Sequence, residues 1–107
     1  MTESVLLHEL VASAAQRSPD APALGVDGRS VAYGELGAAV ERVAAGLVEL
    51  GLRRGQRLAV WLDKRVEFVV ACFATSAAGG VFVPVNPLLK PEQVAHILAD
   101  CNVRILV

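Results

Sequence analysis

The chain has 107 residues, of which 54% are hydrophobic and only 5% are aromatic, a length that suits one domain or part of one. Apolar surface supplied mainly by valine, alanine and leucine favours a sheet that is buried on both faces. Ten basic against eleven acidic residues leave a formal net charge of -1, which offers no general attraction to nucleic acid, so no nucleic-acid partner is expected.

The residues that most often bind metals are few. Cys72 and Cys101 fall inside apolar helical patterns and form no close pair, so both are predicted to be buried reduced thiols. Neither stands at a metal-site spacing from His8 or His96, and no metal site is predicted.

No membrane span is predicted, although residues 68–89 contain no charged side chain and could in length cross a bilayer. Glycines and prolines such as Gly80 and Pro84 divide this segment into a helix and a short strand, and an open strand cannot lie in lipid with its backbone unpaired. Because Glu3 and Glu9 flank the N-terminal apolar run in place of a basic leader, no secretory signal is expected, and the predicted location is the cytoplasm.

The first predicted elements are a helix and a β-hairpin. The helix covers residues 5–17 and ends at Ser18-Pro19-Asp20. Its apolar face is predicted to contain Leu6, Leu10 and Ala14. Two apolar runs, 23–26 and 29–32, then flank Asp27-Gly28, a dipeptide typical of a tight type I′ turn because both positions tolerate positive φ.

A long helix, a strand and a second helix follow. The long helix begins at Tyr33, and Gly51 is predicted to cap its C-terminus. Its apolar stripe is formed by Leu36, Val40, Val43, Leu47 and Leu50. Residues 58–62 are predicted to form a buried strand, and residues 66–78 a helix that Gly79-Gly80 closes.

The last predicted elements are a strand over 81–85, a helix that begins near Pro91, and a strand over 103–107. The helix has its apolar stripe at Val94, Ile97, Leu98 and Cys101. Asn102 is predicted to end it in the left-handed region. Three strands joined by two helices make two β-α-β units, which build a parallel sheet. The predicted fold class is therefore α/β, with an N-terminal helix and a hairpin in front of the sheet, and no second domain is expected.

Two segments carry a resemblance to a known family. The strand-to-helix junction Val31-Ala32-Tyr33-Gly34-Glu35-Leu36 and the segment Gly79–Pro87 are similar to motifs of AMP-forming acyl-CoA synthetases. These enzymes belong to the adenylate-forming superfamily, which also includes peptide-synthetase adenylation domains and luciferases. The resemblance runs from about Ser18 to Val107, so residues 1–107 are expected to form an incomplete N-terminal part of such a domain. Asn86-Pro87-Leu88-Leu89 favours the acyl-CoA ligases over amino-acid activators, whose segment more often reads Leu-Asp-Pro.

Several charged residues have a structural and a functional interpretation. Glu35 is interpreted as a helix-start residue rather than a catalytic acid, although Ala32 cannot supply the hydroxyl half of a capping box. Asp63 follows a strand where α/β sheets bind ligands, and it could instead cap the next helix. Its neighbours Lys64 and Arg65 are predicted to be surface charges.

Two glycine-containing segments are not interpreted as nucleotide sites. Arg53, Arg54 and Arg57 are predicted to be solvated loop charges, because no Lys-Ser/Thr follows Gly55. Gly79-Gly80 precedes its strand, whereas phosphate-binding glycines follow a strand and open a helix.

The resemblance implies a function for the complete enzyme, which would use ATP, magnesium and coenzyme A to activate a carboxylic acid. The family's Ser/Thr/Gly loop ending Pro-Lys-Gly, its Tyr-Gly-x-Thr-Glu segment, its ribose-binding Asp and its catalytic Lys have no match in the sequence. No catalytic, cofactor-binding or metal-binding residue is therefore assigned, and the chain alone is predicted to be an inactive scaffold whose partner is the remainder of the domain. The alternative is a stand-alone binding or interaction module. If the chain is such a partial domain, an exposed sheet edge would favour self-association.

Overall fold

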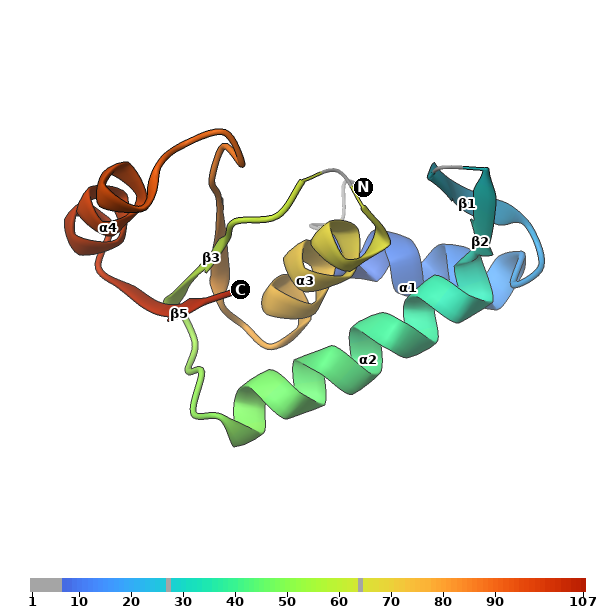
Figure 1. Ribbon diagram of the computed structural model, residues 1–107. Coiled ribbons are helices and arrows are strands. Elements are labelled where there is room, and N and C mark those ends of the chain that lie inside the picture. The colour runs from blue at the N-terminus through green and yellow to red at the C-terminus, as the bar shows by residue number, and fades with distance from the viewer. Residues whose placement is uncertain (1–6, 27, 64) are drawn as a thin grey trace, which may run out of the picture.

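The computed structural model describes residues 7–26, 28–63 and 65–107 and shows an α/β fold, which confirms the predicted class (Figure 1). In chain order the elements are α1 (Leu7–Arg17), β1 (Pro22–Val26), β2 (Arg29–Ala32), α2 (Tyr33–Glu49), β3 (Arg57–Val60), α3 (Val66–Ala77), β4 (Val81–Pro84), α4 (Pro91–Asp100) and β5 (Val103–Leu106). No helix in these ranges is both long enough and apolar enough to cross a bilayer.

The strands form two separate sheets. β1 and β2 make an antiparallel hairpin in which Val26 pairs with Arg29, so the predicted hairpin is confirmed. Gly28 has a φ of 78°, while Asp27 of the predicted turn lies outside the described residues. The other sheet has the order β4-β3-β5, with β3 parallel to both neighbours, as two β-α-β units require.

The parallel sheet lies between two layers of helix. Leu58 and Val60 of β3 belong to a large core with α1, α2 and α3, whereas Ala59 between them packs with Val85 and Val94 on the side of α4. Successive side chains of a strand point to opposite faces, and Figure 1 shows α3 and α4 on opposite sides of β3 and β5. All three β3 residues have an exposed fraction of 0%, so β3 is the buried centre of the fold.

The long helix α2 ends at a glycine, as predicted. Gly51 has a φ of 100°, and its amide donates to the Val48 carbonyl at 3.0 Å while the Leu52 amide donates to the Leu47 carbonyl at 3.0 Å. These bonds form a Schellman motif, which satisfies carbonyls that the helix leaves without partners. Asn102, with a φ of 52°, follows α4 in the left-handed region, which confirms the other predicted helix stop.

Helix α3 ends in the same motif and shows why two glycines are needed. Gly79 has a φ of 87°, and the Gly80 amide donates to the Thr75 carbonyl at 2.9 Å. A Cβ atom placed on Gly80 would lie 2.9 Å from Leu52 Cδ2 and 3.0 Å from the Gln56 carbonyl oxygen. Gly79 therefore adopts the positive φ that ends α3. Gly80 has no side chain, which lets the end of α3 pack against Leu52 and the Gln56 backbone.

The buried faces of α1 and α2 differ from the predicted stripes. In α1 the buried residue is Val11, while Leu10 is 56% exposed and Leu6 lies outside the described residues. In α2 the buried set is Leu36, Val40, Ala44 and Leu47, so the inclusion of Val43 and Leu50 was wrong. The buried arc of α2 is rotated because α1 packs closely beside it, where a Cβ on Gly37 would lie 3.1 Å from that of Ala15.

Both cysteines are free thiols, as predicted. Cys72 is buried in α3, and burial raises the pKa of its thiol. Cys101 is only half-buried because it occupies the C-cap of α4. The prediction of a buried thiol is thus right for Cys72 and too strong for Cys101.

Candidate functional site

The carboxyl end of the parallel sheet is where an α/β fold usually binds ligands, and Asp63 lies there. Helix α3 begins at Val66 with Arg65 as its N-cap, so of the two interpretations of Asp63, the one as a helix cap was wrong. Its Oδ1 instead accepts a hydrogen bond from Arg65 Nε at 2.7 Å. That bond holds the pKa of the Asp63 carboxyl below its usual value, and Lys64 lies outside the described residues.

The Asp63–Arg65 pair is exposed, with 63% and 51% of the two side chains accessible to solvent. An exposed ion pair is screened by water and salt, so it defines no pocket in which charge could be stabilised during a reaction. Within residues 7–26, 28–63 and 65–107, no three His, Cys, Asp or Glu side chains are grouped to hold a metal ion. The interpretation of Asp63 as a ligand for metal or nucleotide stays a prediction.

Glu35 lies at the start of α2, where its Oε1 accepts a hydrogen bond from the Ala32 amide at 3.4 Å. This is the half of a capping box that a Glu at the third helical position can supply, so its interpretation as a helix-start residue is confirmed. At α4 Gln93 does the same for the Lys90 amide at 2.9 Å. The sequence contained that signal, a Gln two residues after Pro91, but it was not predicted.

The arginines before β3 divide into two kinds. Arg53 and Arg54 are exposed in the turn that leads to the strand, as predicted. Arg57, however, is more than a solvated charge, because its Nη1 donates to the Cys101 carbonyl at 2.6 Å. A cation there stabilises the negative end of the α4 dipole. Sequence patterns could not indicate this contact, since it joins residues far apart in the chain.

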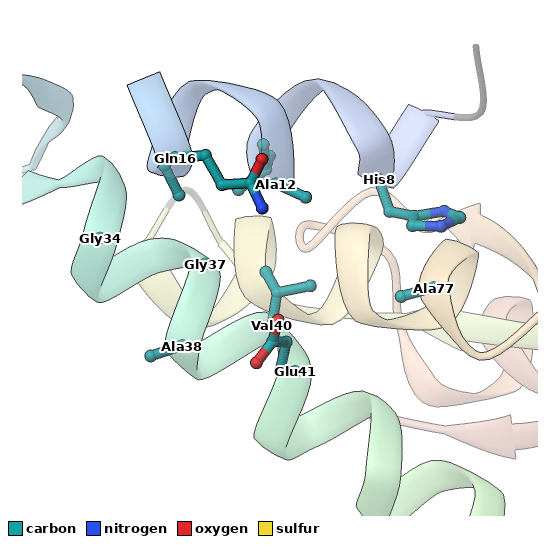
Figure 2. Close-up of a pocket in the computed structure, with 11 residues that line it drawn as sticks. His8, Ala12, Gln16, Gly34, Gly37, Ala38, Val40, Glu41 and Ala77 are labelled. Carbon is teal, nitrogen blue, oxygen red and sulfur yellow. The ribbon is translucent and has the colours of Figure 1, made fainter. Parts of the chain in front are cut away.

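A groove lies where α1, α2 and the end of α3 meet, with a volume of about 390 Å³. Its walls are mostly alanine and glycine, and its polar lining residues are His8, Gln16 and Glu41. Figure 2 shows His8 at one end beside Ala77, with Gln16 at the other end. His8 Nδ1 lies 3.1 Å from Ser76 Oγ, a contact that joins α1 to α3. Among the described residues no hydrogen bond or ion pair joins Glu41 to His8 or Ser76, so the groove pairs a histidine with a serine but shows no acid that orients the histidine.

The fold itself places the chain among proteins whose parallel sheet is covered by helices on both faces. The profile of the family described as AMP-binding enzyme matches residues 11–107. The chain therefore belongs to the AMP-binding enzyme family, and the resemblance inferred from the sequence is confirmed.

Similar proteins include peptide synthetases. Surfactin synthase subunit 2 of Bacillus subtilis (strain 168) is 34% identical over 106 residues, which are 99% of this chain and 3% of that protein. Tyrocidine synthase 3 of Brevibacillus parabrevis is 35% identical over 94% of this chain and 2% of its own length. The chain thus spans a small part of these relatives.

Solved structures that resemble the chain come from two branches. An artificially fused adenylation-PCP di-domain, NpsA-ThdA from Klebsiella oxytoca, has a TM-score of 0.92 at 27% identity, covering 98% of this chain and 20% of that one. The N-terminal domain of FACL13 from Mycobacterium tuberculosis has a TM-score of 0.90 at 26% identity, covering 96% of this chain and 26% of that one. The fold is therefore that of the N-terminal region of adenylate-forming enzymes.

Proposed function

We propose that residues 1–107 form the scaffold at the start of an adenylate-forming domain, and that the complete domain activates a carboxylic acid with ATP to an acyl-adenylate. The observation that carries this proposal is the family match over residues 11–107, together with a fold that covers about a quarter of the FACL13 N-terminal domain. In this proposal the remainder of the domain is the main partner of the chain, and the enzyme acts in the cytoplasm.

The described residues around Asp63 do not form a magnesium site. Asp63, the carboxylate at the expected end of the sheet, is held by Arg65, and the described part of the chain has no metal-binding group of side chains. We therefore derive no catalytic step from these residues. Their contribution is mechanical, because the buried residues Leu58, Ala59 and Val60 of β3 fix the sheet on which the rest of the domain would pack.

The acyl acceptor is proposed to be coenzyme A, on the basis of Asn86-Pro87-Leu88-Leu89. The structure shows what Asn86 does there: its Oδ1 accepts a hydrogen bond from the Leu88 amide at 3.0 Å. An aspartate could accept the same bond, because it also presents a side-chain oxygen to the backbone. The second candidate is an adenylation domain that loads a carrier protein, which the peptide-synthetase relatives favour.

A non-catalytic interaction module remains the alternative from a different class. Self-association of the isolated chain belongs instead to the scaffold proposal, because a partial domain leaves apolar surface uncovered: Leu106 and Val107 at the edge strand β5 are 45% and 42% exposed. The sequence beyond Val107 in the reading frame separates the two classes. An adenylate-forming enzyme requires a Ser/Thr/Gly loop downstream, whereas a stop codon directly after Val107 would favour the module.

The functional test is ATP–pyrophosphate exchange with a panel of carboxylic acids, on the chain itself and on the same chain extended along its reading frame. We expect exchange by the extended protein and none by residues 1–107. Thioester formation with coenzyme A, compared with a carrier protein, would then identify the acceptor. In the extended protein, Asp63→Ala should lower activity only as far as it lowers the folded fraction, with the KM for ATP unchanged. Magnesium-dependent exchange by residues 1–107 that Asp63→Ala abolishes would refute the scaffold proposal.

A further inference from the structure

A second pocket lies at the amino end of the parallel sheet, opposite the end that carries Asp63. It has a volume of about 300 Å³ and is lined by Gly55, Gln56, Arg57, Asn102 and Arg104. Two segments far apart in the sequence form it, the turn that leads into β3 and the turn that leads into β5. Their meeting is fixed by the parallel pairing of Arg57 with Val103.

Gln56 and Arg57 present hydrogen-bond donors to this pocket. Gln56 Oε1 accepts the Arg53 amide at 2.8 Å, which leaves the carboxamide nitrogen of Gln56 to donate. The bond from Arg57 Nη1 to the Cys101 carbonyl uses one of the five N–H groups of a guanidinium and holds its position, so the others stay available. Arg104 adds a second guanidinium from β5.

The charge of the pocket is positive. In the described part of the chain, the ion pairs are Asp63–Arg65 and His96–Asp100, and neither includes Arg57 or Arg104. The C-terminus of α4 contributes about half a negative charge, which two guanidinium charges exceed. The pocket therefore has an excess of positive charge and of hydrogen-bond donors, without an acidic side chain to match them.

We propose that this pocket binds the phosphate monoester dianion of a small soluble ligand. A guanidinium donates two parallel hydrogen bonds to phosphate, and two such groups match both the charge of a dianion and its three terminal oxygens. A carboxylate offers only one charge and two oxygens, so it would leave donors unused. The proposal is independent of the adenylate-forming function, because it rests only on residues that line this pocket. It can therefore be tested on residues 1–107.

The test is a titration of the chain with O-phosphoserine and with inorganic phosphate at constant ionic strength, followed by nitrogen-15 NMR of backbone amides and arginine Nε groups. We expect saturable shifts confined to residues 55–57 and 102–104, and none with serine. Arg104→Gln should weaken binding about tenfold, the effect of losing one charge-assisted contact. Arg42→Gln, which removes the same charge from α2, is the matched control and should change the dissociation constant by less than about twofold, since a remote exposed charge is screened.

Three results would overturn the proposal: shifts spread over all the arginines, equal weakening by Arg42→Gln and Arg104→Gln, or a response only to vesicles of phosphatidic acid and phosphatidylcholine. The last result would mean that a membrane surface, rather than a soluble phosphate, supplies the group. Arg57→Gln also removes the bond to the Cys101 carbonyl, so its folding must be checked by circular dichroism. If it does not fold, Arg104→Gln alone decides the outcome.

Discussion

The close packing of Gly80, at the end of α3, against Leu52 and Gln56, which precede β3, can be tested with Gly80→Ala. The new Cβ would lie 2.9 Å from Leu52 Cδ2, 3.0 Å from the Gln56 carbonyl oxygen and 3.1 Å from Thr75 Cγ2, whereas carbon atoms prefer separations of about 3.5–4.0 Å. Leu52 is 4% exposed and Thr75 is 0% exposed, so neither can move into solvent. The Gln56 carbonyl also accepts the Val81 amide at 2.8 Å, so moving it would strain the start of β4.

Overpacking of this kind costs about 1–3 kcal/mol, which exceeds the gain of about 0.4–1 kcal/mol that alanine brings by restricting the unfolded chain. Gly46→Ala is the matched control, because Gly46 lies within α2 and a Cβ there would have no neighbour within 4 Å. It should raise stability by about 0.5–1 kcal/mol. A shift of 1 kcal/mol corresponds to about 4–8 °C in the melting temperature for a chain of this size, so thermal unfolding measures both variants. If Gly80→Ala melts at or above the wild-type temperature, the packing argument is wrong.

Four further predictions test the corrected side-chain positions and the raised pKa of Cys72. Leu47→Ala should lower the free energy of unfolding in urea by about 2–5 kcal/mol, because Leu47 is 6% exposed. Leu50→Ala should change it by less than about 0.5 kcal/mol, because Leu50 is 74% exposed. Equal effects of the two variants would mean that Leu50 belongs to the buried stripe after all. Asp63→Ala should leave the helical circular dichroism signal and the melting temperature unchanged at neutral pH, since Asp63 bonds Arg65 and does not cap α3. A loss of helical signal in this variant would show that Asp63 does cap α3. A maleimide should label the half-buried Cys101 before the buried Cys72. Because burial raises the pKa of Cys72, stability should fall as pH rises from the pKa of the unfolded thiol through that of the folded one; a Cys72→Ala variant that keeps the same alkaline loss would contradict this assignment.

Local signals in the sequence predicted the order of the elements and the places where helices end. Gly51 and Asn102 were predicted as helix stops because glycine and asparagine adopt positive φ more readily than other residues. The structure shows a positive φ at both positions. The strands follow from apolar runs bounded by glycine or proline, and their parallel pairing follows from the helices between them. Such features depend on neighbours in the sequence, so the sequence alone is enough to find them.

Features that depend on distant neighbours could not be predicted. Val11 is buried and Leu10 is exposed because of the way α1 packs against α2 and α3. The pattern of apolar residues within α1 does not show which of the two faces those helices. The cap interpretation of Asp63 failed for a local reason, because α3 begins two residues later than that interpretation required and Arg65 is its N-cap. The bond between Arg57 and the Cys101 carbonyl exists only once β3 and β5 lie side by side, and the positive pocket depends on the same pairing.

The central position of β3 also has a consequence for the folding pathway. β4 reaches it across one complete helix, and β5 reaches it across two helices and a strand, so the entropy of closing a long loop opposes either pairing before any sheet hydrogen bond forms. The β1–β2 hairpin closes over a short turn and carries no such cost. During refolding or synthesis, Leu58, Ala59 and Val60 therefore stay unpaired for longer than the hairpin and the helices that form around them. Such a segment is a site for aggregation, and dilution or a chaperone that holds apolar strands should raise the yield of folded protein.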